Sequence, residues 1–308
     1  MGRVLVVGAG VVGLSCALRL LEAGHRVDVL ARELPRETTS AVAAAIWYPY
    51  RAWPQDRVLA WSRTGYDEFA RLAAGHPDSG VVLREGTQVV GSRVEKPWWA
   101  DAVPDLHETV DVPEGYDGGW AFTAPLVEMP VYLEWLAGQV LAAGGSITRL
   151  NLHGLPRTGD GGADAVVDCS GIGAKFLASD PSVYPLQGQV VLVEQVGLEH
   201  WWLDGTDDEG PTYVVPRSHD IVVGGTDVEG EWSRTASPEV ATAILRRALR
   251  LVPALAGAEV IGHKVGLRPA RPTVRLERVG DVVHCYGHGG AGVTLSWGCA
   301  YEVAALLS

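Results

Sequence analysis

The sequence is short of lysine and of positive charge. Lys96, Lys175 and Lys264 are its only lysines, and 25 basic residues face 37 acidic ones, which gives a formal net charge of -12. This balance disfavours sequence-independent binding to a phosphate backbone or to anionic lipid. We therefore expect no nucleic-acid partner and no membrane partner.

The sequence also lacks a cysteine motif. Its four cysteines, Cys16, Cys169, Cys285 and Cys299, form no CxxC pair and have no metal-ligand spacing. We expect no metal and buried free thiols, which fit a reducing, cytoplasmic location. The apolar run over residues 4–21 has no basic leader and no clear cleavage site, so we do not expect a signal peptide.

The 308 residues, of which 47% are hydrophobic, suffice for one large or two interleaved domains. Two patterns alternate along the chain: strand–helix units, and short alternating runs typical of antiparallel strands and hairpins. Helices are predicted near residues 130–145 and 238–251, and a last helix is predicted to follow the glycine loop at residues 287–292 directly and to run through residues 297–307. We predict a mixed α/β fold in which a Rossmann-like dinucleotide domain (residues 1–51, 130–182 and 266–308) is interleaved with a mixed, largely antiparallel-sheet substrate domain (residues 52–129 and 183–265).

Gly8, Gly10 and Gly13 form a complete GxGxxG motif between a predicted strand and a predicted helix, and a second strand follows near residues 25–31. In such a βαβ unit the first glycine makes the turn, the second lets a pyrophosphate approach, and the third lets helix and strand pack closely. The pattern predicts a dinucleotide but does not say which one.

An acid that binds the ribose is expected about twenty residues after the motif, but Ala31 stands there, followed by Arg32 and Glu33. On the βαβ unit alone, Arg32 leaves NADP and a nicotinamide-dependent dehydrogenase open, because an arginine there can bind a 2′-phosphate.

Longer motifs lead to a family. The stretches "GAGVVGLS", "TTSAVAAAIWYPYR", "YVVP", "GLRPARPTVRLE" and "VVHCYGHGGAGVTLSWGCA" occur in the order of the D-amino acid oxidase family, and the similarity spans the whole chain. Cys285 stands where that family usually has Asn, His or Ala. The resemblance implies a glutathione-reductase-like FAD fold, so that Arg32 would lie at the adenosine end of FAD.

The resemblance also implies an activity. A D-amino acid would lose a hydride from its α-carbon to flavin N5, giving a 2-oxo acid and ammonia after hydrolysis, while dioxygen reoxidises the flavin to yield hydrogen peroxide. Such a reaction needs orientation rather than a protein acid or base, and we expect no residue in that role. The implied cofactor-binding residues are Gly8, Ala9, Gly10, Val11, Val12, Gly13, Arg32, Thr38, Thr39, Ser40, Ala44, Ala45, Ile46, Leu150, Ser170, Gly289, Gly290, Gly292, Val293 and Thr294.

A substrate carboxylate requires a cationic partner, and a guanidinium matches it bidentately. Arg268 and Arg271 lie three residues apart in "LRPARP", and in an extended backbone both could face one side. The resemblance assigns the substrate to Arg268. It also makes Tyr213 a second donor to the same carboxylate.

We expect side-chain selectivity to come from Ile46, Tyr48 and Val215, which are apolar or amphipathic and favour a neutral, apolar substrate. Arg217 keeps D-aspartate as an alternative, because an acidic side chain would want a second cation. The family's second tyrosine, on a mobile lid, has no counterpart here because Glu209 takes its place. We expect a shorter lid, or coverage of the pocket by Trp201 or Trp202.

Four glycines lie between Gly287 and Gly292. Side chains there are expected to block the flavin and the substrate, while the Gly290 carbonyl accepts from the substrate amine and the N–H groups of residues 292–294 stabilise the flavin edge. We assign His284 and His288 no acid or base role. The alternatives left open are a D-aspartate oxidase and a flavin-binding protein without turnover; a homodimer is also open.

Overall fold

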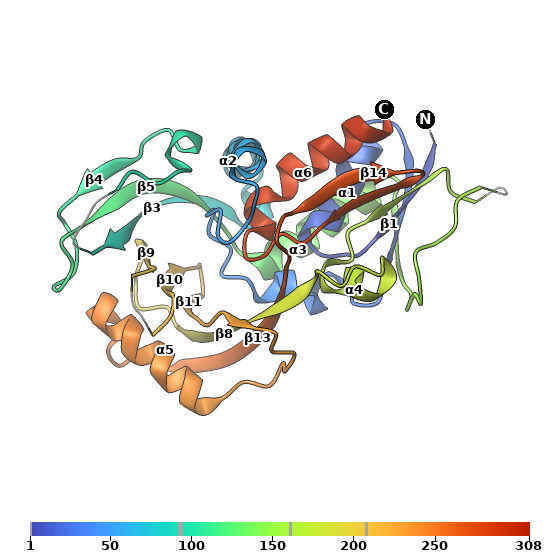
Figure 1. Ribbon diagram of the computed structural model, residues 1–308. Helices are drawn as coiled ribbons and strands as arrows, with labels where there is room; N and C mark the ends of the chain where they lie inside the picture. Colours follow the sequence, from blue (N-terminus) through green and yellow to red (C-terminus); the bar gives the residue numbers. More distant parts are fainter. Residues whose placement is uncertain (1, 92–94, 160–161, 207–208) are drawn as a thin grey trace.

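The protein is described here by a computed structural model that covers residues 2–91, 95–159, 162–206 and 209–308. Two sheets lie side by side, with one helix between them at the top of the view in Figure 1. The α-helices are α1 (Val11–Glu22), α2 (Gln55–Gly75), α3 (Met129–Ala142), α4 (Ala174–Leu177), α5 (Pro238–Leu251) and α6 (Gly292–Leu307).

The first sheet has six strands in the order β14-β15-β7-β1-β2-β6. They are β14 (Arg275–Val279), β15 (Val282–Tyr286), β7 (Ala165–Asp168), β1 (Arg3–Val7), β2 (Arg26–Ala31) and β6 (Ser146–Arg149). All neighbours pair in parallel except β14 and β15. The central strands are valine-rich and mostly buried, as is typical of a parallel sheet covered on both faces.

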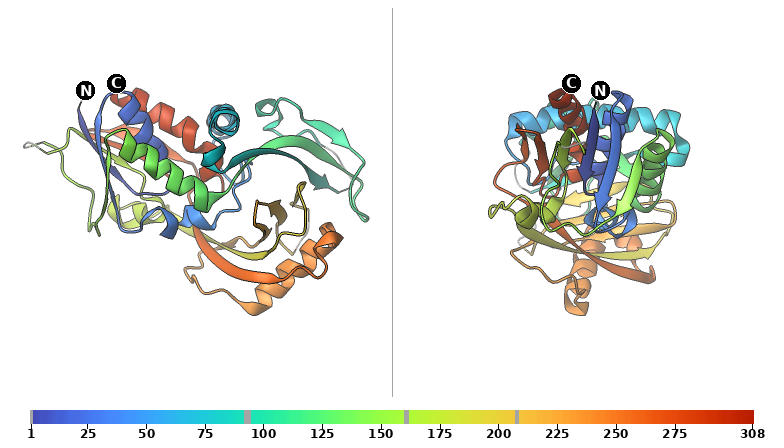
Figure 2. Two further views of the ribbon diagram at one scale, coloured as in Figure 1. Left: turned by 180° about the vertical axis from the view of Figure 1, so that it is seen from behind. Right: turned by 90° about the vertical axis from the view of Figure 1, so that its right-hand side faces the viewer.

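The second sheet has nine strands: β12-β8-β11-β10-β9-β3-β5-β4 along its path, with β13 paired to β8. They are β3 (Val81–Val90), β4 (His107–Thr109), β5 (Gly118–Val127), β8 (Tyr184–Glu194), β9 (Trp201–Asp204), β10 (Thr212–Pro216), β11 (Asp220–Gly224), β12 (Val228–Glu229) and β13 (Val260–Ala270). Its pairings are antiparallel apart from β3 with β9. Helix α5 packs on β8, β10 and β11, on the outer side of this sheet in Figures 1 and 2.

Helix α5 begins at the predicted residue for a local reason. The Ser237 hydroxyl caps it by accepting a hydrogen bond from the Val240 amide at 3.2 Å, and Pro238 occupies the first helical position. Its buried residues recur at helical spacing and cover the second sheet: Ala241, Ile244, Ala248 and Leu251.

Helix α2 was not predicted, because the sequence from residue 52 onward suggested strands and irregular loops. It crosses α6 closely at two glycines. A Cβ on Gly65 would lie 2.1 Å from the Thr294 carbonyl oxygen, and one on Gly298 would lie 2.4 Å from the Trp61 backbone. The crossing therefore requires glycine on both helices and fixes the amino end of α6.

The predicted first βαβ unit, the helices near residues 130–145 and 238–251, and the mixed α/β class are confirmed. Helix α6 begins at Gly292, directly after the glycine loop as predicted, and continues through residues 297–307. All strands of the first sheet fall within the three segments expected for the dinucleotide domain, while β13 crosses residue 266. The domain boundaries themselves stay a prediction.

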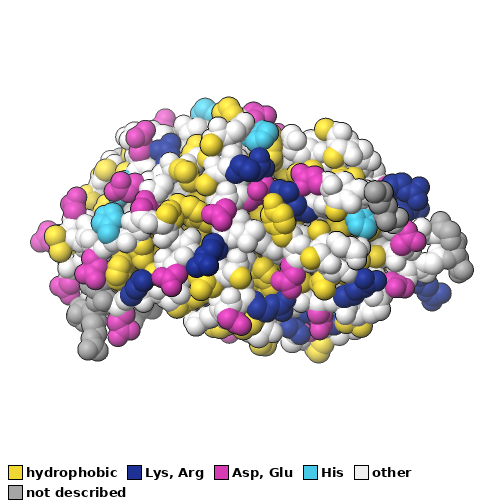
Figure 3. Space-filling model, turned by 90° about the horizontal axis from the view of Figure 1, so that it is seen from above, with side chains coloured by type: hydrophobic (Ala, Val, Ile, Leu, Met, Phe, Trp, Pro, Cys, Tyr) yellow, Lys and Arg dark blue, Asp and Glu magenta, His cyan; other side chains and the backbone are white. Residues whose placement is uncertain are grey.

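Both termini lie at one end of the molecule, beside the first sheet (Figures 1 and 2). On the face shown in Figure 3, acidic and basic side chains are interspersed, so neither sign dominates there. Among the described helices, none combines the length and the apolar character needed to cross a membrane.

Candidate active site

The loop after β1 is built so tightly that two of its glycines are obligatory. Gly8 has a φ of +113°, and an added Cβ would lie 2.4 Å from the Cys169 carbonyl oxygen. A Cβ on Gly13 would lie 2.0 Å from the Gly8 carbonyl oxygen. These glycines let α1 pack directly against the ends of β1 and β7.

Gly10 differs from its two partners. A Cβ there would meet only two side-chain oxygens, the Ser40 hydroxyl at 3.1 Å and the Thr38 hydroxyl at 4.0 Å, so a small shift of Ser40 would make room at this position. The first amides of α1 point toward this space, and the Val11 amide donates to the Ser40 hydroxyl at 3.1 Å. Space beside a helix amino terminus suits a pyrophosphate.

A cavity of about 420 Å³ continues from this loop to the second sheet. Every residue predicted to bind the cofactor lines it, as do the predicted substrate residues Arg268, Tyr213, Gly290, Ile46 and Tyr48. The positions therefore meet in one site although they come from both ends of the chain. The position beside Gly10, where no backbone atom lies close, and the adjoining cavity fit a dinucleotide whose ring system extends toward the second sheet.

Arg268 and Tyr213 lie together on the second-sheet side of the cavity. The Arg268 Nη1 donates to the Thr226 carbonyl oxygen at 2.8 Å, and its Nη2 donates to the Tyr213 hydroxyl at 3.4 Å. The guanidinium lies over Gly188, where an added Cβ would be 2.4 Å from Cζ. Because the tyrosine oxygen accepts from Arg268, its own O–H is available for an anion.

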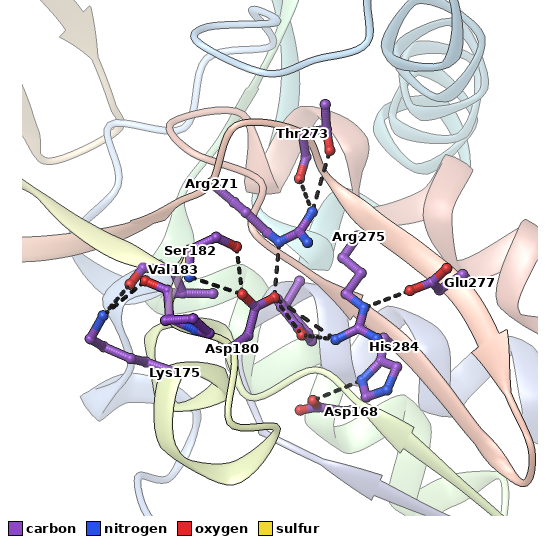
Figure 4. A network of polar contacts seen from close by, with 12 residues as sticks. Asp168, Lys175, Asp180, Ser182, Val183, Arg271, Thr273, Arg275, Glu277 and His284 are labelled. Carbon is purple, nitrogen blue, oxygen red and sulfur yellow. Dashed lines mark hydrogen bonds and ion pairs between the residues drawn. The ribbon is translucent and has the colours of Figure 1, made fainter.

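Arg271 does not share this position, although its spacing from Arg268 allowed both arginines to face one side. Its Nε donates to Asp180 Oδ2 at 2.9 Å and its Nη1 to the Thr273 carbonyl oxygen at 3.0 Å, as Figure 4 shows. Tyr286 and Ser182 donate to the same carboxylate. Arg271 belongs to this structural network, outside the cavity lining.

Arg217, the candidate second cation, is also outside the cavity lining. It is buried and forms a bidentate ion pair with Asp220, at 2.5 and 2.7 Å. Among the described residues that line the cavity, Arg32 and Arg268 are the only arginines or lysines. Arg32 is at the opposite end, largely exposed and paired with Glu33 at 3.2 Å.

Val215 does not reach the cavity. It shares a face of β10 with Tyr213, but it is fully buried in the core beneath the site. The expectation that Val215 contacts the substrate side chain is therefore not supported. Ile46 and Tyr48 do line the cavity, and burial raises the pKa of the Tyr48 hydroxyl, which keeps it neutral.

Neither predicted tryptophan covers the site. Trp201 is fully buried, with its indole N–H donating to the Arg84 carbonyl oxygen at 2.8 Å and its ring against Phe122. Trp202 packs in the core on the α5 side of the second sheet. Glu209, which replaces the family's lid tyrosine, forms an ion pair with Arg246. Residues 207 and 208 lie outside the described part of the chain.

The sequence missed Tyr50, Gln88 and Asp204, which all line the cavity. The Tyr50 hydroxyl donates to Asp227 at 2.8 Å. Asp204 is buried and accepts from the Tyr116 hydroxyl and from both donors of Thr206. Tyr50 could have been found as the second tyrosine of the "WYPY" motif. The other two come from separate strands and left no local signal.

The loop before α6 requires glycine because of contacts within the protein, in addition to the expected approach of flavin and substrate. A Cβ on Gly289 would lie 2.3 Å from the Arg51 carbonyl oxygen, and one on Gly290 would lie 2.5 Å from the Tyr50 ring. These added atoms would collide with the segment at residues 50–51, so the glycines allow close packing of two chain segments. The amino end of α6 still faces the cavity, through Gly292, Val293 and Thr294.

Comparison with known proteins agrees with this site. Residues 3–306 match the DAO family model, described as FAD dependent oxidoreductase. A D-amino-acid oxidase of Rubrobacter xylanophilus is 50% identical over 99% of this chain and 96% of the relative, and one of Streptomyces coelicolor is 43% identical over 100% and 97%. A human D-aspartate oxidase is 37% identical over 99% of this chain and 94% of its own.

Among solved structures, the glycine oxidase of Geobacillus kaustophilus superposes with a TM-score of 0.83 over 100% of this chain and 95% of its own, at 22% identity. That likeness supports the fold. The family match spans nearly the whole chain, and the nucleotide loop, the cavity and the amino end of α6 fit its cofactor. The protein therefore belongs to the DAO family of FAD-dependent oxidoreductases.

Proposed function

We propose that this enzyme oxidises neutral D-amino acids to 2-oxo acids and ammonia, with dioxygen as the electron acceptor and hydrogen peroxide as the second product. The observation that carries the proposal is the pair of Arg268 and Tyr213 in a cavity continuous with the nucleotide loop. A carboxylate clamp at that place suits an amino acid.

The fold alone does not choose between substrates, since related structures include a glycine oxidase and an L-amino acid deaminase. The D configuration is supported by the two bacterial relatives named D-amino-acid oxidase.

When bound, FAD supplies a two-electron acceptor for oxidation at the substrate α-carbon. The chain's own residues bind and orient the substrate. The Arg268 N–H groups and the Tyr213 O–H donate to its carboxylate, and the Gly290 carbonyl is proposed to accept from its amine. Because these contacts fix two substituents of the α-carbon, only one enantiomer would place its side chain toward Ile46 and Tyr48 and its hydrogen toward the cofactor. We assign no residue to acid or base catalysis.

The cavity favours a neutral side chain over an acidic one. Arg268 is already committed to the carboxylate, and no other arginine or lysine among the described residues lines the second-sheet end. Asp204 lies there instead and would repel a second carboxylate. D-Aspartate would therefore bury a charge without a partner.

A panel of amino acids with peroxide detection tests the proposal. D-Alanine and D-valine should yield peroxide, and L-valine should yield none. The kcat/KM for D-aspartate should be at least about tenfold lower than that for D-alanine, because the second carboxylate has no cationic partner. Peroxide from L-valine alone would contradict the proposed chirality. FAD-loaded protein without turnover on any substrate would favour a flavin-binding protein.

We further propose a cytoplasmic location, because all four cysteines are free thiols and such thiols persist in reducing compartments. A homodimer stays a prediction that light scattering of the purified protein can test.

A further inference from the structure

All four cysteines meet in one buried cluster, although they are far apart in the sequence. Strand β15 pairs in parallel with β7, with His284 opposite Asp168, so the following residues, Cys285 and Cys169, are neighbours. Helix α1 brings Cys16 to them, and the Sγ atoms of these three cysteines lie within 4.8 Å of one another. All four thiols are free.

A second triad shares Cys285. Its members are Cys285, His288 and Cys299, whose sulfur and ring-nitrogen atoms also lie within 4.8 Å of one another, and all three residues are buried. The distance from Cys285 Sγ to His288 Nε2 is 4.0 Å. Tetrahedral zinc with bond lengths near 2.3 Å to sulfur and 2.1 Å to nitrogen places such atoms about 3.6 Å apart. A contraction of about half an ångström would bring Cys285 and His288 to that separation, and the other two pairs, which lie within 4.8 Å, need roughly 1 Å at most.

Charge balance separates the two triads. Two thiolates and a neutral imidazole compensate a divalent cation fully, whereas three thiolates would leave a net negative charge in the core. The triad with His288 is therefore the better cation site. Cys16 and Cys169 then have a different role, since their Sγ atoms lie within 4.8 Å of Cys285 Sγ, where their S–H groups can point toward its thiolate.

The site is accessible from one side. Cys285 and His288 line the cavity, while Cys299 lies behind them on α6 with no exposed surface. In the FAD-free protein a cation can therefore reach the triad from the cavity, and a fourth ligand, such as water, would have to come from that side. Three protein ligands with an open fourth position are typical of zinc sites that are not closed structural ones.

We infer that Cys285, His288 and Cys299 form a binding site for a divalent cation of the zinc class. The inference goes beyond amino acid oxidation and does not depend on which substrate the enzyme uses.

Cobalt is the probe for the test, because its visible spectrum reports tetrahedral coordination and its near-ultraviolet charge-transfer band reports thiolate ligands. The full-length chain, freed of FAD and checked for native circular dichroism, is titrated with Co²⁺. One equivalent should produce both signals, and Zn²⁺ should displace the cobalt. The variants Cys285→Ala and Cys299→Ala should bind cobalt about a hundredfold more weakly or worse.

The matched control is Cys16→Ala, which removes a buried thiol of the same cluster that is not a ligand in this site. It should keep both signals at saturation. A wild-type titration without the charge-transfer band overturns the inference, whatever the variants do. So does a Cys16→Ala variant that loses the band while Cys299→Ala keeps it, because that result assigns the cation to the thiol triad. None of these outcomes bears on peroxide production, so the proposed oxidase function is tested separately.

Discussion

At the scale of single residues, the difference between Arg268 and Arg271 shows what decides the role of an arginine. Arg268 lies near the end of β13 and Arg271 directly follows the strand, both in a proline-rich stretch, and spacing alone could place either in the site. Arg271 donates its hydrogen bonds to Asp180 and to the Thr273 carbonyl oxygen. Arg268 has one donor bound to Thr226 and another near Tyr213. Its position in the cavity leaves the remaining donors for a ligand.

Replacing Arg268 by alanine should lower kcat/KM for D-alanine by about a thousandfold, or about 4 kcal/mol, because two charge-assisted hydrogen bonds to the carboxylate are lost. FAD binding should persist, since Arg268 is on the second-sheet side of the cavity. Steady-state peroxide kinetics and the flavin absorbance of the purified variant measure the two effects.

The control is Arg271→Ala, which removes a nearby guanidinium that is outside the cavity lining. Its partners, Asp180 and Thr273, belong to the structural network. It should lower the melting temperature and leave the KM for D-alanine nearly unchanged. If Arg268→Ala kept wild-type kinetics, the carboxylate would have to bind elsewhere.

At the scale of elements, structure that is marked by a local sequence motif could be predicted, whereas structure without such a motif could not. The βαβ unit could be predicted because Gly8, Gly10 and Gly13 mark the turn from a valine-rich strand into a helix, and a second valine-rich strand follows. Helix α2 was missed although Val58, Trp61 and Phe69 recur at helical spacing, because nearby tryptophan and proline suggested loops.

The candidate site shows the same division. Motif residues such as Arg268 and Tyr213 could be named from the sequence, whereas Gln88 and Asp204 enter the cavity only through the pairing of β3 with β9. The cysteine cluster likewise depends on the parallel register of β7 and β15 and on the packing of α1 against α6. The spacing of residues along the chain does not predict contacts that arise from strand pairing and helix packing.

The turn before α1 permits a test of the cofactor site at this scale. Gly10→Ala should fold normally, because Gly10 has φ −75° and its added Cβ meets only side-chain oxygens. The methyl group should nevertheless weaken FAD binding by roughly tenfold to a hundredfold, as expected for 1–3 kcal/mol of overpacking against the pyrophosphate. Titration of FAD-free protein, followed by flavin fluorescence, gives the dissociation constant.

Gly13→Ala is the comparison variant, since its Cβ would lie 2.0 Å from a backbone oxygen and should lower the stability of the fold itself. Wild-type FAD affinity in Gly10→Ala would mean that the pyrophosphate does not approach this loop.

At the scale of the whole molecule, the two sheets are joined by a polar network around Asp180 as well as by apolar packing. Asp180 lies between α4 and β8 and accepts hydrogen bonds from Ser182, from Arg271 beyond β13 and from Tyr286 of β15 (Figure 4). The side chain is only 8% exposed. Segments of both sheets therefore meet at one carboxylate, which must be ionised to accept all these bonds.

This network predicts how stability changes with pH. Burial alone would raise the pKa of Asp180, but the hydrogen bonds from Ser182, Tyr286 and Arg271 outweigh it and lower the pKa to about 2. The unfolded chain has a pKa near 3.9 at this group, so the ionised carboxylate stabilises the fold by about 2 kcal/mol at neutral pH. That contribution is fully present above the unfolded pKa and is lost as the pH falls through the folded pKa.

The variant Asp180→Asn cannot titrate and should be less stable than wild type at pH 7. The gap in unfolding free energy between the two proteins should narrow by about 1 kcal/mol between pH 6 and pH 3, because roughly half of the contribution is lost by then. Urea unfolding of the FAD-loaded proteins at the two pH values measures it. The control is Asp101→Asn, which breaks an ion pair with Lys96 in which the Asp101 side chain is 72% exposed. The unfolding free energy of this variant should differ little from that of wild type at either pH value. A gap for Asp180→Asn that stays constant would mean that the carboxylate titrates alike in the folded and unfolded chains, and that the network does not link the two sheets through its charge.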